Sequence, residues 1–317
     1  MTPQPLYYDC DTGIDDSLAL AYLLASPEIE LVGIGTVSGN VTSAQAARNT
    51  LALLALAGHP AVPVAVGAAD PQAGTYTGAV PHIHGHNGIG DITVPDSAHS
   101  AAEQRAAELI ISLARQHHGN LRILTTGPLT NIAEALRLEP ELPTRIRDIT
   151  IMGGAALQTG NISPVAEANI GNDPEAAAEV LAAPWPITLV PLDVTLSHTL
   201  EETDRQTLLD STSPLPRALG DMLNLYFDFY RSTYGRRCCA IHDPLAAAIA
   251  VGGVKPTLAP VVDVVVDATH GPGRGQTICD LRGRYLDYPA QPGAHCRVVL
   301  EADPSAPAHL VERLLTL

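Results

Sequence analysis

The chain has 317 residues, 46% of them apolar, which is enough for one large hydrophobic core. Its formal net charge of −16 argues against nucleic acid as a partner, because binding to phosphates relies on clustered Lys and Arg. The apolar stretches are broken by Gly, Pro and charged residues before they reach the roughly 18 to 20 residues of a transmembrane helix, so we predict no membrane partner.

The first predicted element is an acidic turn between a strand and a helix. Residues 6–8 read as the end of a strand, and residues 17–25 have the pattern of a helix. The turn carries four carboxylates within eight residues, those of Asp9, Asp11, Asp15 and Asp16. One of them could simply cap the helix, but capping does not account for four. Crowded carboxylates repel each other unless a cation lies among them, so we predict a site for a hard metal ion.

The strand and helix patterns then alternate. Residues 30–37 are predicted as a buried strand that ends in Ser38-Gly-Asn40, and residues 43–56 as a helix with Ser43 as its N-cap. A short strand follows at residues 62–66. This alternation predicts the α/β class, and we expect one domain that spans residues 1–317.

A long segment without periodicity follows, from Gly67 to about Ala98. It contains three histidines at alternating positions, His82, His84 and His86. A transition-metal site would need a further ligand, so we interpret the segment as a lid that contacts substrate. A solvated connecting loop is the alternative.

Polar residues follow the next strands as well. A helix is predicted at 101–117 and a strand at 121–126, so the oxygens of Thr126 could lie near a metal ion. A further strand at 149–154 precedes a segment with Asn161, Glu167 and Asn169. These three side chains could bind the vicinal hydroxyls of a sugar, although asparagine often only makes turns.

The last predicted site elements are two helices. Residues 215–234 form an aromatic-rich helix whose Tyr226 and Tyr230 could stack on a planar group, although such stripes more often pack in the core. The next helix begins at His242 and Asp243. There Asp243 could cap the helix or reach a metal ion, and His242 could donate a proton near neutral pH.

The five cysteines are an odd number without a repeated C-x-x-C spacing. They predict neither a disulfide scaffold nor a zinc site, and they fit a reducing compartment. The first residues lack a basic segment followed by an apolar one, so we predict no signal peptide. The expected location is therefore the cytoplasm.

Seven blocks that span nearly the whole chain resemble the inosine-uridine-preferring nucleoside hydrolases, and they come in the order of that family. They are Asp9-Cys-Asp-Thr-Gly-Ile-Asp-Asp16, Val37-Ser-Gly-Asn40, His82-Ile-His-Gly85, Thr126-Gly-Pro-Leu-Thr-Asn131, Met152-Gly-Gly154, Ala166-Glu-Ala-Asn169 and His242-Asp-Pro244. The resemblance implies an open, mostly parallel sheet with helices on both faces. It also implies a Ca²⁺-dependent enzyme that hydrolyses the N-glycosidic bond of ribonucleosides to free base and ribose.

The resemblance also assigns roles to residues. It implies that calcium is held by the carboxylates of Asp11, Asp16 and Asp243 and the main-chain carbonyl of Thr126. It implies that ribose is held by Asp15, Asn40, Asn161, Glu167 and Asn169. The expected base pocket contains His84, Tyr226 and Tyr230. The expected catalytic residues are Asp11, which activates a metal-bound water as general base, and His242, which assists the leaving base through an oxocarbenium-like transition state.

The chain departs from the family pattern at a few positions. Thr12 replaces a usual proline, and His86-Asn87 replaces a usual Glu-Ser pair in a loop on the base side. Arg236 and Arg237 could touch the base or be ordinary surface charges. Purine-specific relatives stack the base between tryptophans, whereas the single Trp185 lies far from these loops in the sequence. We therefore expect a pyrimidine-preferring or broad specificity that includes uridine, cytidine and inosine.

Three alternatives can be compared with the same residues. A haloacid-dehalogenase-like phosphatase needs Thr or Val where this chain has Gly13, and it uses a lysine, whereas this chain has only Lys255. An EF-hand needs a Glu at loop position twelve, which is Leu20 when counted from Asp9. A catalytically silent relative that only binds nucleosides remains open. Relatives in this family form dimers or tetramers, so a homodimer or homotetramer is expected.

Overall fold

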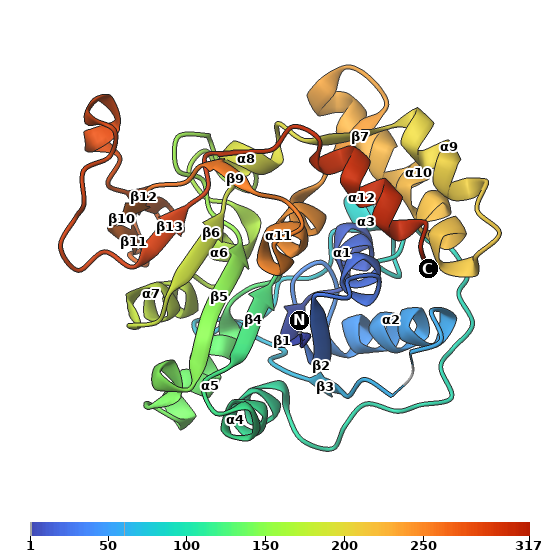
Figure 1. Ribbon diagram of the computed structural model, residues 1–317, viewed down its shortest axis with the longest axis horizontal. Helices are drawn as coiled ribbons and strands as arrows, with labels where there is room; N and C mark the ends of the chain where they lie inside the picture. The colour runs from blue at the N-terminus through green and yellow to red at the C-terminus, as the bar shows by residue number, and fades with distance from the viewer. Residues whose placement is uncertain (1, 60) are drawn as a thin grey trace.

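The computed structural model describes residues 2–59 and 61–317, and its centre is an eight-stranded sheet (Figure 1). The strands of this sheet are β1 (Gln4–Cys10), β2 (Ile29–Thr36), β3 (Val64–Val66), β4 (Leu121–Thr125), β5 (Ile146–Met152), β6 (Ile187–Val190), β10 (Val261–Val262) and β13 (Cys296–Val298). Their order is β10-β13-β6-β5-β4-β1-β2-β3, and every neighbouring pair is parallel except β10 with β13. The open, mostly parallel sheet is therefore confirmed.

Helices cover both faces of this sheet. One hydrophobic cluster contains residues of α1 (Ile14–Leu24), α2 (Ser43–Leu56), α10 (Pro214–Tyr234), α11 (His242–Val251) and α12 (Ala306–Leu314). The other contains residues of α4 (Ala106–His117), α5 (Thr130–Leu138) and α7 (Pro174–Ala182). The neighbouring residues Tyr7 and Tyr8 of β1 belong to different clusters, as the two-residue period of a strand requires. The α/β class with helices on both faces is confirmed (Figure 1).

Shorter elements complete the fold. The remaining helices are α3 (Pro81–His84), α6 (Ala168–Asn172), α8 (Leu192–Thr195) and α9 (Glu202–Leu209), with 3₁₀ turns at Leu142–Thr144 and Arg282–Leu286. Three small antiparallel pairs join β7 (Thr199–Glu201) to β8 (Cys238–Ala240), β11 (Val264–Val266) to β12 (Thr277–Cys279), and β9 (Pro256–Leu258) to β14 (Glu301–Ala302).

Three local predictions need correction. The N-cap of α2 is Thr42 rather than Ser43, because the Thr42 hydroxyl accepts a hydrogen bond from the Gln45 N–H. The helix predicted from 101 begins at Ala106, since Ala102 N–H donates instead to Val64 O at the sheet edge. The long segment after Gly67 is not entirely irregular, because it contains the short helix α3.

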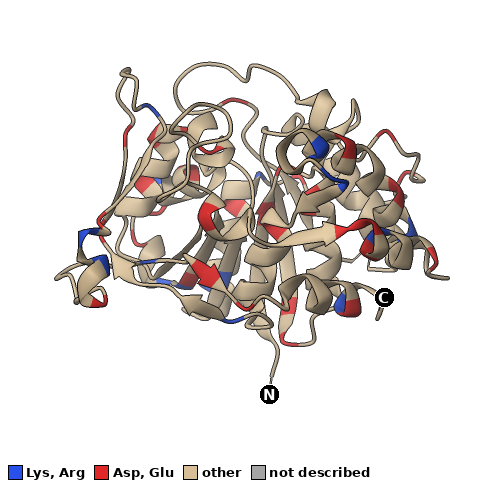
Figure 2. Ribbon diagram, turned by 90° about the horizontal axis from the view of Figure 1, so that it is seen from above, with Lys and Arg blue, Asp and Glu red and all other residues tan. Residues whose placement is uncertain are grey.

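The connections place the polar residues at one edge of the sheet. The central strands β5, β4, β1 and β2 are adjacent and parallel, so their carboxyl ends lie side by side. Asp9 lies within β1, the other three acids of the predicted turn follow that strand, and Thr126 follows β4. Figure 2 shows that the few basic residues are spread over separate elements among many acidic ones. Within the described residues, no helix is long and apolar enough to cross a membrane.

Candidate active site

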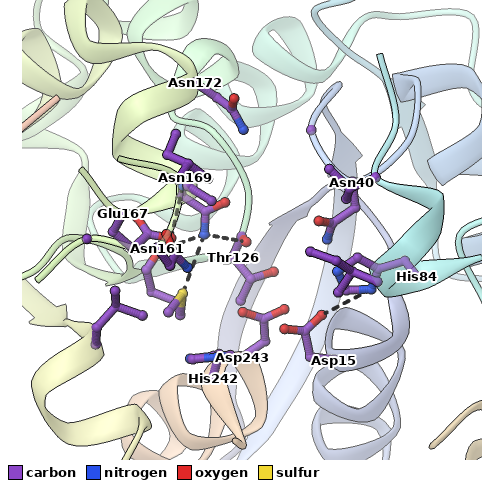
Figure 3. A pocket seen from close by; sticks show the side chains of 18 of the residues that line it. Asp15, Asn40, His84, Thr126, Asn161, Glu167, Asn169, Asn172, His242 and Asp243 are labelled. Atoms are coloured by element: carbon purple, nitrogen blue, oxygen red, sulfur yellow. Dashed lines mark hydrogen bonds and ion pairs between the residues drawn. The ribbon is translucent and has the colours of Figure 1, made fainter. Parts of the chain in front are cut away.

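A pocket of about 470 Å³ lies beside the carboxyl ends of β4 and β5. Most of the residues predicted for a site line it, and Figure 3 shows that they come from both of its sides. These residues are Asp15, Asn40, His84, Thr126, Asn161, Glu167, Asn169, Tyr226, Tyr230, His242 and Asp243. Asp11 and Asp16 are buried and are not among the lining residues. The structure thus brings together residues that are up to 228 positions apart in the chain, from Asp15 to Asp243.

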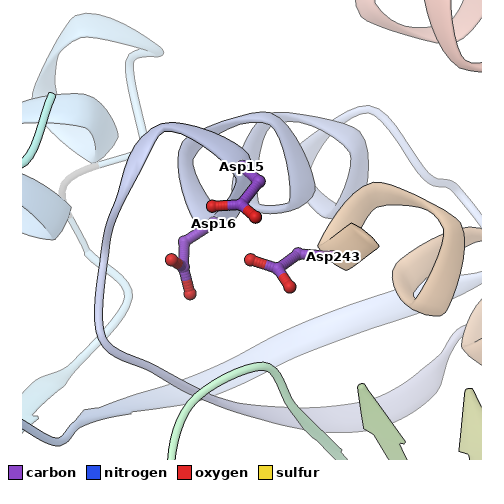
Figure 4. A group of neighbouring side chains, drawn as sticks. All are labelled: Asp15, Asp16 and Asp243. Carbon is purple, nitrogen blue, oxygen red and sulfur yellow. The ribbon is translucent and has the colours of Figure 1, made fainter. Parts of the chain in front are cut away.

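Three carboxylates meet at one end of this pocket. Asp15 and Asp16 lie in the first turn of α1 and Asp243 in the first turn of α11, and each offers one oxygen within 4.8 Å of the others. Figure 4 shows the three side chains pointing toward one another. Asp15 Oδ1 is buried and has no hydrogen-bond partner among the residues that the structure describes. All the possible ligand atoms are carboxylate oxygens, and one of them lacks a hydrogen-bond partner. These residues therefore fit a hard divalent cation.

Asp11 lies next to this cluster and is joined to it by Asn40. The Asn40 backbone N–H donates to Asp11 Oδ2 at 2.6 Å, and its side-chain amide donates to Asp11 Oδ1 at 3.2 Å and to Asp16 Oδ2 at 3.1 Å. A Cβ on Gly39 would lie only 2.0 Å from Asp11 Oδ2, so this close approach needs glycine. The cluster of three thus contains Asp15 rather than Asp11, and the division of these acids between metal and ribose stays a prediction.

The carboxylates in this region resist ionisation. Burial raises the pKa of Asp11 well above its usual value, and the neighbouring Asp16 raises it further. Burial also raises the pKa of Asp16 and of Asp243, and in both cases the next largest cause is repulsion from Asp15. A bound cation reverses this cost, because it stabilises the charged form of each carboxylate.

Asp9, the remaining acid of the cluster of four, lies in β1 and contacts neighbouring side chains of the core. Its side chain is fully buried and accepts hydrogen bonds from the Tyr7 hydroxyl at 2.7 Å and from the Asn131 amide at 3.1 Å. Burial raises its pKa to about 6. Asp9 does not line the pocket, and its bond to Asn131 joins β1 to the start of α5.

Amide and hydroxyl groups form the wall next to the cluster. Thr126 donates through its hydroxyl to Asp16 Oδ1 at 2.7 Å, and its main-chain carbonyl accepts from the Asn169 amide at 2.8 Å. A carbonyl oxygen has two lone pairs, so this bond leaves room for a cation. The Glu167 carboxylate accepts three backbone N–H bonds, from Gly154, Asn169 and Ile170. Glu167 thus caps α6 and also lines the pocket.

Aromatic side chains form the opposite wall. The Tyr226 hydroxyl donates to Asp15 Oδ2 at 2.8 Å, so Tyr226 orients an acid of the cluster in addition to lining the pocket. The Tyr230 hydroxyl lies 2.5 Å from His242 Nε2, and His242 Nδ1 lies 2.7 Å from Thr195 Oγ1. Burial lowers the pKa of His242 to about 4. The expectation that this ring titrates near neutral pH is therefore wrong, and the ring is uncharged there.

His84 is held in one tautomer by the chain itself. The Ile14 backbone N–H donates to His84 Nδ1 at 3.0 Å, and a backbone N–H can only donate, so the neutral ring carries its proton on Nε2. Burial lowers the pKa of His84 to about 4. His84 therefore faces the pocket as an uncharged hydrogen-bond donor.

This shifted pKa predicts an acid-dependent stability. Between about pH 6.5 and pH 4 the unfolded chain binds a proton at His84 that the folded protein does not, so the free energy of unfolding falls as pH drops. A shift of this size corresponds to about 3 kcal/mol. In a His84→Asn variant the amide oxygen keeps the bond to Ile14 but does not titrate, and we expect a smaller loss. Urea unfolding at pH 7 and pH 4.5 measures the difference.

The exposed His86 provides the matched control for this prediction, because His86→Asn changes the same kind of side chain two residues away. If His84→Asn loses as much stability between pH 7 and pH 4.5 as the parent protein, His84 is not the source of that loss.

Other residues line the pocket without having been singled out in the sequence. Tyr76 donates to Gly39 O at 3.1 Å. It is the only Tyr, Phe or Trp between Gly67 and Ala98, and this feature of the sequence could have marked it as a pocket residue. Asn172 follows Asn169 by one helical turn. Thr233 lies one turn after Phe229 on α10, and nothing in the sequence marks it.

Four residues whose roles the sequence left open lie outside the pocket lining. His86 pairs with Asp91, and the Asn87 side chain accepts the N–H groups of Ile89 and Asp91, so both residues shape a turn. Arg236 pairs with Glu201, and Arg237 pairs with Glu202 and Asp228 at the surface. Their alternative reading as surface charges fits these contacts. Trp185 is fully buried in the sheet core away from the pocket.

Comparisons with known proteins agree with this architecture. The family described as inosine-uridine preferring nucleoside hydrolase matches residues 6–307, so the chain belongs to this family of nucleoside hydrolases. It is 36% identical to uridine nucleosidase 1 of Arabidopsis thaliana over 278 residues, which cover 87% of this chain and 82% of that protein. It is 34% identical to an inosine-uridine preferring nucleoside hydrolase of Crithidia fasciculata over 303 residues, 95% of this chain and 94% of that one.

A solved structure is similar over the whole chain. The purine-preferring ribonucleoside hydrolase from Gardnerella vaginalis is 36% identical, with a TM-score of 0.90 that covers 99% of this chain and 98% of that one. Relatives of similar identity thus carry names that refer to purine and to pyrimidine nucleosides.

Proposed function

We propose that this protein hydrolyses the N-glycosidic bond of ribonucleosides to free base and ribose, with Ca²⁺ as cofactor. The observation that carries the proposal is the pocket itself. It places an oxygen-only carboxylate cluster between a wall of amides and a wall of aromatic side chains. A ribose needs the cluster and the amides, and a base needs the aromatic wall. Membership of the nucleoside hydrolase family supports the same chemistry.

Calcium would be held by Asp11, Asp16, Asp243 and the main-chain carbonyl of Thr126. The carboxylates are buried, crowded and reluctant to ionise, which is the environment that a cation stabilises. The pocket leaves space for the further oxygens that complete the six to eight ligands calcium prefers, from water and from ribose hydroxyls. When bound, the ion would orient and acidify a water molecule.

Asp11 is the proposed general base. Its carboxylate is held by two hydrogen bonds from Asn40, so its oxygens have a fixed direction. Bond cleavage develops positive charge on the sugar, and the surrounding carboxylates stabilise that charge. Asp11 takes the proton from the attacking water, which becomes the anomeric hydroxyl of ribose.

Ribose would be held by Asp15, Asn40, Asn161, Glu167 and Asn169. In Figure 3 Asp15 and Asn40 lie on one side of the pocket and the other three on the opposite side, so a sugar between them can be gripped from both sides. The unsatisfied Asp15 Oδ1 is an acceptor that such a hydroxyl can use.

The base would contact His84, Tyr226 and Tyr230, and His242 would assist its departure. We propose a pyrimidine-preferring or broad specificity, because the described aromatic wall holds His, Tyr and Phe side chains but no tryptophan.

We also propose that the chain forms a single domain, works in the cytoplasm and assembles as a homodimer or homotetramer. The five free cysteines support a reducing compartment.

Release of reducing sugar tests this function. We expect the protein to release ribose from uridine, cytidine or inosine, and we expect a calcium chelator to abolish the release until calcium is returned. Nucleoside binding without sugar release would identify a catalytically silent relative. Release of inorganic phosphate from a phosphate monoester would identify a phosphatase. The relative rates within the nucleoside panel measure the base preference.

A further inference from the structure

The one-turn helix α8 borders the pocket and contacts both its aromatic wall and the loop that carries Asn161. Leu192 and Leu196 line the pocket, and the Leu192 N–H donates to Gly154 O at 2.9 Å, which fixes α8 to the end of β5. On the aromatic side, Thr195 bonds to His242. On the amide side, Asp193 faces the loop of residues 155–165, which carries Asn161.

The Asp193 carboxylate holds this loop by its backbone. Its Oδ2 accepts the Ala156 N–H at 2.8 Å, and its Oδ1 accepts the N–H groups of Leu157 at 2.7 Å and Gln158 at 3.2 Å. Hydrogen bonds to an ionised carboxylate are about twice as strong as neutral ones. Three successive backbone amides are therefore fixed by one side chain.

The start of the loop is also held by packing, because Ala155 is buried and Ala156 is half-buried against the core. Leu157 is 60% exposed and does not pack into the core, so the bonds from Asp193 matter most at residues 157 and 158. The later half is tied to the buried Ala166, since the N–H groups of Asn161 and Ile162 both donate to Ala166 O. The next residues after the three held amides, from 159 to 162, line the pocket. Asp193 thus fixes this wall at its first end, and Ala166 fixes it at its second end.

We propose that Asp193 is a positioning residue for the ribose site, which acts by holding the loop at residues 156–158 so that Asn161 meets the substrate. The proposal deepens the proposed nucleoside hydrolase function and rests on it. Asp193 itself does not line the pocket. Its loss should leave the metal ligands in place and weaken substrate binding, which raises KM more than it lowers kcat.

Steady-state kinetics of an Asp193→Ala variant test this proposal. We expect kcat/KM for the best nucleoside to fall by about 10- to 100-fold, mostly through KM, because a misplaced contact of about 1 Å can cost that much. Asp193→Asn keeps one acceptor oxygen, so it should restore part of the loss. The matched control is Asp204→Ala, because Asp204 also accepts a backbone N–H, that of Glu201, but Glu201 does not belong to a loop that lines the pocket. An unchanged KM in Asp193→Ala would overturn the proposal.

A double-mutant cycle with Asn161→Ala separates loop positioning from a general structural effect. If Asp193 acts through Asn161, its substitution should cost less than threefold in kcat/KM when Asn161 is already alanine. If the losses of kcat/KM in the two single variants multiply in full in the double variant, the proposal is overturned. The effect of Asp193 would then act through α8 and His242.

Hydrogen exchange provides a readout that does not depend on turnover. In the free protein we expect the amides of residues 156–158 to exchange faster in Asp193→Ala than in the parent. Unchanged exchange of these amides would contradict the proposal that Asp193 holds the loop. Failure of the proposed function would look different, because the parent protein itself would then release no ribose.

Discussion

Replacing Asp11 by alanine is expected to lower kcat for uridine or inosine by about 10²- to 10⁴-fold, the range for loss of a general base. Asp11 is 2% exposed, and its carboxylate is oriented by two hydrogen bonds from Asn40. Removal of this buried acid also relieves repulsion with Asp16, so the fold should persist. Initial rates of ribose release measure the effect, and circular dichroism checks the fold.

Asp11 has two proposed roles, and calcium titration separates them. If it only held the ion, saturating calcium would restore kcat in Asp11→Ala, and that result would contradict the general-base role. Near-normal turnover without added calcium would contradict both roles. The matched control is Asp9→Asn, because Asp9 lies two residues before Asp11 and is also buried, but within the described residues its carboxylate bonds to Tyr7 and Asn131, outside the pocket lining. We expect that variant to change stability more than kcat.

The sequence predicted the acidic turn because its signals are local. An apolar run, four carboxylates and a helical pattern follow one another within twenty residues, and each has one simple structural meaning. The meeting of Asp16 with Asp243 is different, because it depends on how α1 packs against α11. No periodicity encodes that distance, and only the ordered resemblance to a family connected the two residues.

The errors have local physical causes. Thr42 and Ser43 are both good N-cap residues, and the choice between them depends on backbone dihedral angles that sequence does not reveal. Residues 101–105 have helix-forming composition, yet the hydrogen bond from the Ala102 N–H to Val64 O keeps the start of this segment out of the helix. The four-residue α3 is too short to show a period.

The role of Asp193 could not be predicted, since its three partners are backbone amides. Backbone groups are the same in every residue, so the sequence of the loop at 156–158 carries no sign of the contact. The same reason hides the tautomer of His84, which is set by the Ile14 N–H. The titration of His242 was misjudged because its burial comes from elements distant in sequence.

The burial of His242 changes how it can assist the leaving base. With a pKa of about 4 the ring is uncharged at neutral pH, so it has one N–H donor and one acceptor nitrogen. Its two neighbours, the Tyr230 and Thr195 hydroxyls, can each donate or accept. The ring or the Tyr230 hydroxyl can therefore face the leaving base as an uncharged hydrogen-bond donor, which stabilises the negative charge that develops on the base, and the base takes its proton from water.

Replacing His242 by alanine is therefore expected to lower kcat for uridine and inosine by about 10²- to 10⁴-fold. The variant should retain most of its activity on nitrophenyl riboside, because nitrophenolate is a stable anion that leaves without a proton. Tyr230→Phe is the matched variant, since it removes only the hydroxyl next to His242 Nε2, and it should show the same preference with a smaller loss. Equal loss on both substrates would count against leaving-group activation and would assign His242 to shaping the pocket around Asp243.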